Sequence, residues 1–174
     1  LGRRGSTDGS SSGVNSSIYY YNGSFTHSID LNGLFQSSIA IGELNNNSKL
    51  DLLLSGSTES SDGTYIFNQS NTFVNVQNLS GQRKTSISLA DFDNDNKIDL
   101  FISGSTSSTV GNGKTYIYQN NGTDFNLFSV LNGTRDGSLT VGDFNNDGLI
   151  DLIVTGKHTS NQNIIEFYTN DGTN

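Results

Sequence analysis

The chain has 174 residues and a formal net charge of −8, with an isoelectric point of about 4.4. This length supports one domain with a hydrophobic core, and the acidity disfavours nucleic acid and anionic membrane surfaces as partners. Cysteine is absent, which excludes disulfides and thiol chemistry, and no apolar run is long enough to predict membrane insertion. Short β-branched and aromatic runs alternate with Gly, Asn and Ser turns, which predicts an all-β fold.

The N-terminal residues 1–17 are rich in Gly and Ser and are expected to form a flexible arm or a long loop. Residues 18–33 follow, with two predicted strands on either side of the turn Asn22-Gly23. The chain begins with Leu and shows no signal-peptide segment, so we expect a processed or excised piece.

Three successive units then share one pattern and are predicted at residues 34–81, 82–133 and 134–174. Each unit contains a strand, an acidic loop, a nearly continuous apolar strand, a second loop and an aromatic strand. The first two units add a fourth strand, whereas the third unit ends where its fourth strand is expected to begin. Four antiparallel strands repeated at about 50 residues are the pattern of a β-propeller blade.

The acidic loop of the second unit, residues 91–99, places carboxylates at its positions 1, 3, 5 and 9. Position 6 is Asn96, a residue type that tolerates the positive φ of a tight loop. Carboxylates about 4 Å apart repel by roughly 1 to 4 kcal/mol per pair, and a hard cation removes this repulsion. Oxygen ligands without nitrogen or sulfur favour Ca²⁺ over zinc or copper.

The same nine-residue pattern recurs closely at residues 143–151 and more loosely at residues 43–51. The first residues of the three loops, at positions 43, 91 and 143, are 48 and 52 positions apart. An EF-hand is a competing interpretation, but it needs a Glu at position 12 and flanking helices, which this sequence lacks. Ordinary Asn/Asp turns are the second alternative. At residues 43–51 an ordinary turn and a cation site both remain open, because Glu43 replaces Asp and the residues at positions 3 and 5 are neutral.

The strings VGDFNNDGLIDLIVTG (141–156) and LADFDNDNKIDLFISG (89–104), the latter followed by YQNNGTDF (118–125), carry a family resemblance. They resemble the FG-GAP/VCBS repeats of integrin-α-like, calcium-binding β-propellers. The resemblance covers nearly all of residues 18–174 and implies blades of four strands, with a cation loop between the first and second strand. About three to four blades are then present, either as part of a larger propeller, which we favour, or as a unit whose copies assemble through open blade edges.

In each loop, side chains at positions 1, 3, 5 and 9 and the backbone carbonyl at position 7 are the expected ligands. The carboxylate counts of four, three and two predict an affinity that falls from the second loop to the third and then to the first. Two Ca²⁺ sites are therefore expected, with a third in question, and their role is structural. The predicted ligands are Asp91, Asp93, Asp95, Lys97 and Asp99; Asp143, Asn145, Asp147, Leu149 and Asp151; and Glu43, Asn45, Asn47, Lys49 and Asp51.

Three classes of function remain open, because a fold does not fix a function. The first is an extracellular or cell-surface module that binds a protein or a glycan, as in adhesion. The second is a structural subunit whose open blade edges pair with copies of itself in a fibre or other assembly. The third is the propeller part of a polysaccharide-active enzyme; we expect no enzyme activity, because His27 and His158 are isolated and predict no catalytic group.

Seven sequons permit N-linked glycosylation in a secretory setting. They begin at Asn15, Asn22, Asn46, Asn68, Asn78, Asn121 and Asn132.

Overall fold

The computed structural model describes residues 15–58, 60–69, 73–105, 113–158 and 162–173. Within these ranges the chain forms thirteen strands and no helix, and thus no helix long and apolar enough to cross a membrane. The strands are β1 (Asn15–Tyr21), β2 (Phe25–Asn32), β3 (Phe35–Gly42), β4 (Asp51–Ser57), β5 (Asp62–Gln69), β6 (Phe73–Ser80), β7 (Arg83–Ala90), β8 (Asp99–Ser105), β9 (Gly113–Asn120), β10 (Phe125–Asn132), β11 (Arg135–Gly142), β12 (Asp151–Lys157) and β13 (Asn163–Tyr168).

The strands form four antiparallel sheets, each made of consecutive strands. β1 and β2 form a two-stranded sheet, which we call the N-terminal hairpin. Blade 1 contains β3 to β6 and blade 2 contains β7 to β10, whereas blade 3 contains the three strands β11 to β13. The prediction of an all-β fold with antiparallel, propeller-like blades is confirmed.

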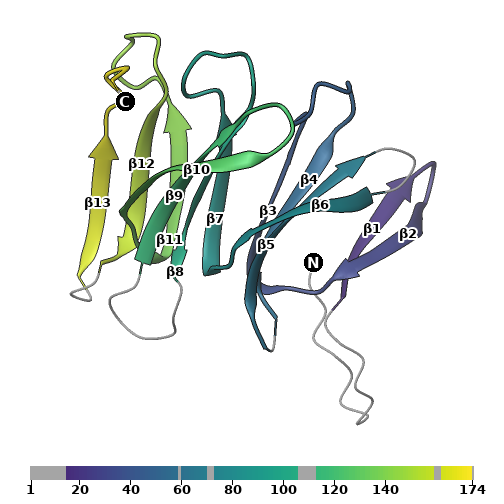
Figure 1. Ribbon diagram of the computed structural model, residues 1–174. Helices are drawn as coiled ribbons and strands as arrows, with labels where there is room; N and C mark the ends of the chain where they lie inside the picture. The colour runs from purple at the N-terminus through teal and green to yellow at the C-terminus, as the bar shows by residue number, and fades with distance from the viewer. Residues whose placement is uncertain (1–14, 59, 70–72, 106–112, 159–161, 174) are drawn as a thin grey trace.

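The first strands of the three blades, β3, β7 and β11, lie side by side, and the sheets follow one another in chain order (Figure 1). Apolar clusters fill the spaces between neighbouring sheets. Between the hairpin and blade 1 the cluster contains Leu31, Leu34, Leu52, Leu54 and Phe67. Between blades 1 and 2 it contains Leu44, Leu53, Ile66, Leu100, Ile102, Tyr118 and Phe125. Between blades 2 and 3 it contains Phe92, Phe101, Leu139, Leu152 and Val154.

The second strands of blades 1 and 2, β4 and β8, supply core to the sheets on both sides. In β4, Leu52 and Leu54 pack toward the hairpin, whereas Leu53 packs toward blade 2. This follows from the two-residue alternation of a strand, and it explains why every residue of β4 and of β8 is buried. A short apolar run, Leu52 to Leu54 in β4, is thus the sequence signature of a strand covered on both faces. Leu50 precedes β4 and is exposed.

The hairpin begins earlier than the sequence suggests. The arm was expected to extend to residue 17, but β1 begins at Asn15, and Ser16 and Ser17 pair with Leu31 and Asp30. The Ser17 hydroxyl also donates to the Asp30 carboxylate at 2.5 Å. Residues 15–17 thus belong to a strand because their backbone pairs with β2, although their composition is typical of a loop. Residues 1–14 lie outside the described residues.

Candidate metal centre

The three acidic loops occupy equivalent places in the fold. Residues 43–51 join β3 to β4, residues 91–99 join β7 to β8, and residues 143–151 join β11 to β12. All three lie at the same end of the sheets, at the top of Figure 1. The fold therefore places the predicted ligands in three separate loops, one for each blade.

Each loop has two residues in the left-handed backbone conformation. Position 6 was predicted to have a positive φ, and it does, at Ser48 (63°), Asn96 (66°) and Gly148 (88°). Position 4 also has a positive φ, which the sequence analysis missed, at Asn46 (59°), Asn94 (60°) and Asn146 (61°). Asn is the signal that could have found it, because Asn is the non-glycine residue that most readily enters this region.

Side-chain oxygens hold each loop in shape through hydrogen bonds to the backbone. In the second loop the Asp95 amide donates to Asp91 Oδ1 at 3.0 Å and to Asp93 Oδ1 at 3.2 Å, and the Lys97 amide donates to Asp95 Oδ1 at 2.9 Å. The equivalent bonds recur in the first loop, with Glu43, Asn45, Asn47 and Lys49, and in the third, with Asp143, Asn145, Asp147 and Leu149. These are Asx-type turns, so neutral Asn serves as well as Asp for the shape of the loop.

The Asp at position 9 connects the loop to the third strand of its own blade. Asp99 Oδ2 accepts from the Phe92 amide at 2.9 Å, and Asp99 Oδ1 accepts from the Asn120 amide at 2.8 Å. Asp51 and Asp151 accept the equivalent pairs of bonds, and all three carboxylates are buried. Burial and, to a smaller extent, the nearby charges of Asp93 and Asp95 raise the pKa of Asp99 to about 6, although the two hydrogen bonds act in the opposite direction.

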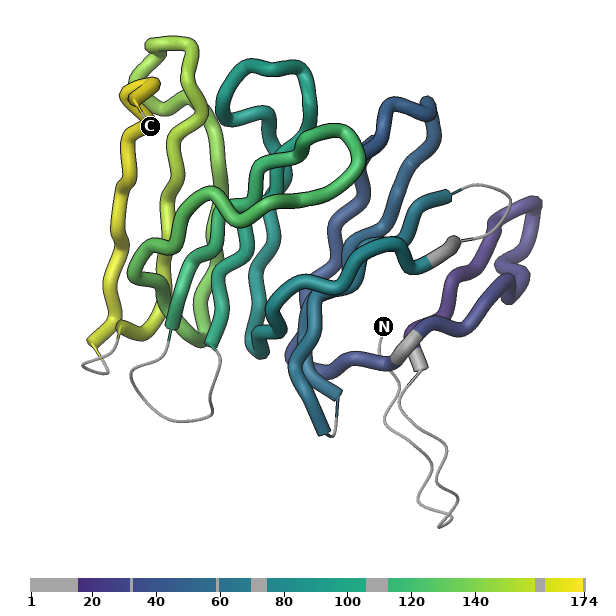
Figure 2. Tube along the Cα trace, viewed as in Figure 1, coloured from purple at the N-terminus to yellow at the C-terminus, as the bar shows by residue number. Residues whose placement is uncertain are grey.

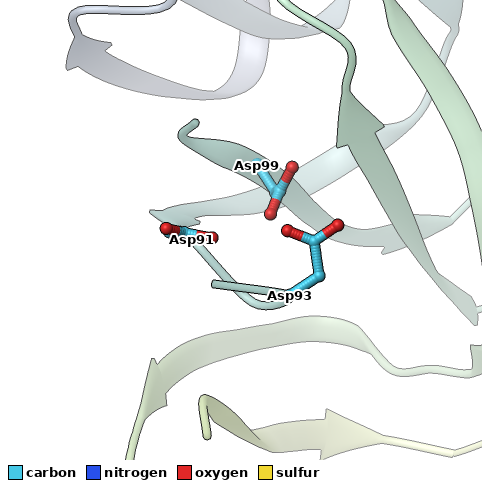
Figure 3. A group of neighbouring side chains, drawn as sticks. All are labelled: Asp91, Asp93 and Asp99. Carbon is cyan, nitrogen blue, oxygen red and sulfur yellow. The ribbon is translucent and has the colours of Figure 1, made fainter. Parts of the chain in front are cut away.

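The second loop brings three carboxylates together. Asp91, Asp93 and Asp99 each offer an oxygen, and these atoms all lie within 4.8 Å of one another. Figure 3 shows the three side chains directed toward a common space. A cluster of oxygens from ionisable carboxylates fits a hard divalent cation, which would offset the repulsion between them. Within the described residues no other group of three acidic or histidine side chains meets this distance.

Asp95, the fourth predicted carboxylate, is bound to a cation of the protein itself. Its Oδ2 accepts a short hydrogen bond from the Lys97 ammonium. This bond lowers the pKa of Asp95 and raises the pKa of Lys97. Lys97 was predicted to contribute only its backbone carbonyl, so the structure adds a side-chain role. Its ammonium neutralises one of the four charges of the loop.

The first and third loops carry fewer charges in the same backbone frame. In the first loop, Glu43 Oε1 accepts from the amides of Asn45 and Asn47, and the Asn47 amide group donates to the Gln69 carbonyl. In the third loop, the Asn145 side chain donates to Asp147 Oδ2 at 2.8 Å. Among the described residues, only the second loop brings oxygens of three carboxylates within 4.8 Å of one another.

Two asparagines that the sequence analysis missed connect the loops of neighbouring blades. Asn120 is the last residue of β9 in blade 2, and its side-chain amide donates to the Leu44 carbonyl in the first loop and to the Ile98 carbonyl in the second. Asn170 occupies the equivalent place in blade 3 and donates to the Phe92 carbonyl in the second loop. The signal was an Asn two residues after a Tyr in both repeats, at Tyr118 and Tyr168.

His27, which the sequence predicts to have no catalytic role, lies near a serine and an aspartate in the structure. His27 Nε2 lies 2.9 Å from Asp30 Oδ1, and Ser17 donates to the same oxygen. In a nucleophilic triad the histidine stands between the serine and the acid, whereas here the acid stands between the other two. This exposed group therefore lacks the arrangement that activates a serine.

A model of the FG-GAP-like repeat matches the sequence twice, at residues 43–102 and 91–154. Both matches begin at position 1 of an acidic loop, at Glu43 and at Asp91, and together they span more than half of the chain. No curated protein matches the chain. The repeats, the loops at one end of the sheets and the antiparallel blades all agree, and the chain belongs to the FG-GAP repeat family.

Proposed function

We propose that this protein is a calcium-stabilised, β-propeller-like interaction module in which the cation has a structural role. The observation that carries the proposal is the convergence of Asp91, Asp93 and Asp99 in a loop of the FG-GAP-like repeat. All three donors are carboxylate oxygens, the chemistry that Ca²⁺ prefers. A bound Ca²⁺ would link the loop to the buried Asp99 at the start of β8 and so stabilise the first two strands of the blade.

The other two loops would bind more weakly. Carboxylate counts of four, three and two support the order second, third and first loop. The first loop already has its shape without charged residues at positions 3 and 5, so its fold needs no cation.

A thermal melt with 1 mM Ca²⁺ against excess chelator tests the structural role. Two sites with a Kd of about 10⁻⁴ M would each add about 1.4 kcal/mol at this Ca²⁺ concentration, which raises the melting temperature by roughly 5 to 10 °C in a chain of this size. Asp93→Asn is the sharp variant, because Asn at position 3 keeps the loop hydrogen bond in the other two loops. We expect it to reduce the calcium shift by roughly half and to leave the melt in chelator unchanged or higher.

The matched control is Asp124→Asn, which removes an exposed carboxylate outside the three loops and should leave the calcium shift intact. Asp143→Asn should reduce the shift through the third loop, and Asn47→Ala should have little effect. Equal melts in calcium and chelator would refute the proposal, as would an Asp93→Asn loss of the same size in both conditions.

We further propose an extracellular or cell-surface location and a protein or glycan partner, without enzyme activity. FG-GAP repeats are typical of extracellular proteins, and loop sites with a Kd of about 10⁻⁴ to 10⁻³ M fill only at extracellular Ca²⁺ concentrations. Submicromolar binding at all three loops would count against this location. A glycan array and a polysaccharide-cleavage assay separate glycan binding from catalysis, and the mass in solution separates a monomeric module from a subunit that pairs with its own copies.

A further inference from the structure

The fourth carboxylate of the second loop is held apart from the other three. Asp91, Asp93 and Asp99 offer oxygens within 4.8 Å of one another, and Asp95 is not among them. Both Asp95 oxygens are bonded to Lys97 instead: Oδ1 accepts from its backbone amide at 2.9 Å, and Oδ2 accepts from its ammonium. Asp95 can offer Oδ2 to a metal ion only after the ammonium has moved away, because two cations at one oxygen repel each other.

The stem of Lys97 lies beside the turn between β9 and β10. Its Cδ and Cε atoms lie 3.7 and 3.6 Å from the position that a Cβ atom would take on Gly122. In Figure 2 this turn (green) lies beside the second loop (teal). The hydrogen bond to Asp95 and, more weakly, the charges of Asp95, Asp93 and Asp99 raise the pKa of Lys97. The ammonium is thus placed where it meets the charges of the whole loop.

The third loop has the same backbone frame without an ammonium. Its position 7 is Leu149, whose amide donates to Asp147 Oδ1 at 2.9 Å, and Asp147 Oδ2 accepts from the neutral Asn145 side chain at 2.8 Å. The first loop has Lys49 at position 7 but Asn47 at position 5, and so no carboxylate there. Of the three loops, only the second combines a lysine at position 7 with an acid at position 5.

This lysine changes the charge that a metal ion meets. Four carboxylates and one ammonium give the second loop a net charge of −3, which equals the charge of the three carboxylates in the third loop. The attraction of the second loop for a divalent cation is therefore weaker than its carboxylate count alone predicts.

We propose that the Lys97 ammonium is the resident counter-ion of the second loop and that Ca²⁺ must displace it from Asp95 to bind. This inference rests on the proposed function and adds a residue that sets the affinity of the site without being a side-chain ligand. Displacement needs no change of the loop backbone, because the four-carbon stem can turn the ammonium into solvent. Lys97 thereby narrows the difference in affinity between the second and third loops.

Calorimetric titration with Ca²⁺ at low salt tests the displacement, with Asp143→Asn present throughout to weaken the third loop. Lys97→Met keeps an unbranched stem against Gly122 and removes the charge, so the Kd of the second loop should fall about three- to tenfold. Lys97→Arg keeps the charge and should stay close to the parent. The matched control is Lys114→Met, which removes the same charge at the end of blade 2 opposite the loops and should leave the Kd unchanged.

Two further measurements show whether Lys97 acts through Asp95. In an Asp95→Asn background, where Asn keeps the loop hydrogen bond as Asn47 does, Lys97→Met should change the Kd little, because no carboxylate then holds the ammonium. In chelator, Lys97→Met should lower the melting temperature by roughly 1 to 4 °C, because the four carboxylates lose their counter-ion. This loss should shrink as salt is added.

An equal or higher Kd in Lys97→Met than in the parent would overturn the displacement, and the proposed function would stand. A Lys97→Met chain as stable in chelator as the parent would overturn the role of Lys97 as counter-ion. If neither the parent nor Lys97→Met bound Ca²⁺, the proposed function and the displacement would both be refuted, and the melts in chelator would decide the counter-ion role by themselves.

Discussion

Replacement of Asn120 by Ala tests whether one side chain connects blades 1 and 2. Asn120 is 2 % exposed, and its side-chain amide donates to the Leu44 carbonyl at 2.8 Å and to the Ile98 carbonyl at 3.0 Å. Its Oδ1 accepts from the Gly122 amide at 2.8 Å. Ala removes all three bonds but keeps the Asn120 backbone amide, which donates to Asp99.

The expected loss follows from the number of bonds and their burial. Each bond contributes about 1 kcal/mol, and buried carbonyls left without a donor add to the cost, so Asn120→Ala should lower the free energy of unfolding by about 3 kcal/mol. That loss corresponds to a fall in melting temperature of roughly 6 to 12 °C. Asn170→Ala removes two side-chain hydrogen bonds, to the Phe92 carbonyl and from the Gly172 amide, at a less buried position, and it should cost roughly half as much.

Urea unfolding followed by far-ultraviolet circular dichroism measures the free energy of unfolding of both variants. The measurement is made in chelator, so that calcium binding does not contribute. Asn126→Ala on the exposed face of β10 is the matched control and should stay within about 0.5 kcal/mol of the parent chain. Asn120→Asp, which keeps the shape but replaces the donor by an acceptor, should be at least as damaging as Ala. If Asn120→Ala behaved like the control, the contact between Asn120 and the first loop would contribute no stability and the argument would fail.

Two further predictions concern single loops. Asp99 must be ionised to bind Ca²⁺, so the affinity of the second loop should weaken about tenfold per pH unit below pH 6. Binding at pH 6 should release about half a proton, which calorimetry in buffers of different ionisation enthalpy measures. Without calcium the sign reverses: the raised folded-state pKa of Asp99 favours folding below its usual value of 3.8, and this contribution is lost as the pH rises through about 6. Ser48→Asn should stabilise the first loop by about 0.5 to 1 kcal/mol, because Ser48 has a φ of 63° and Asn adopts this left-handed conformation more readily than Ser. Asn96→Ser should destabilise the second loop by a similar amount. If neither change altered the melting temperature, the backbone argument would be refuted.

The strands were predictable because their patterns are local. β4 and β8 each contain three consecutive apolar residues and are covered on both faces, and each lies between turn residues that the sequence shows directly. The place of the acidic loops was predictable for the same reason, since Asp91 and Asp99 are separated by only eight positions. A pattern that lies within one hairpin needs no knowledge of how the sheets stack.

Contacts between blades were not predictable in the same way. Asn120 and Leu44 are 76 positions apart in sequence, and Asn also occupies exposed loop positions in this chain, such as Asn94 and Asn146. The ion pair between Lys97 and Asp95 was not predicted for a different reason. Only the backbone carbonyl of Lys97 was expected to take part in the loop, whereas the structure shows that its ammonium contacts the Asp95 carboxylate. Both cases depend on where a side chain points, which spacing alone does not give.

The comparison of the three loops separates the shape of the loop from its charge. Positions 3 and 5 vary between acid and amide, and the backbone bonds they accept are the same in all three loops, because an Asn oxygen accepts a hydrogen bond as an Asp oxygen does. Position 9 is Asp in every loop, at Asp51, Asp99 and Asp151, where both oxygens accept backbone amides while buried. Asn there would turn an NH₂ group toward a backbone amide and leave a buried donor unpaired. The varying positions therefore set how strongly a loop attracts a cation, whereas the Asp at position 9 is required by the blade itself.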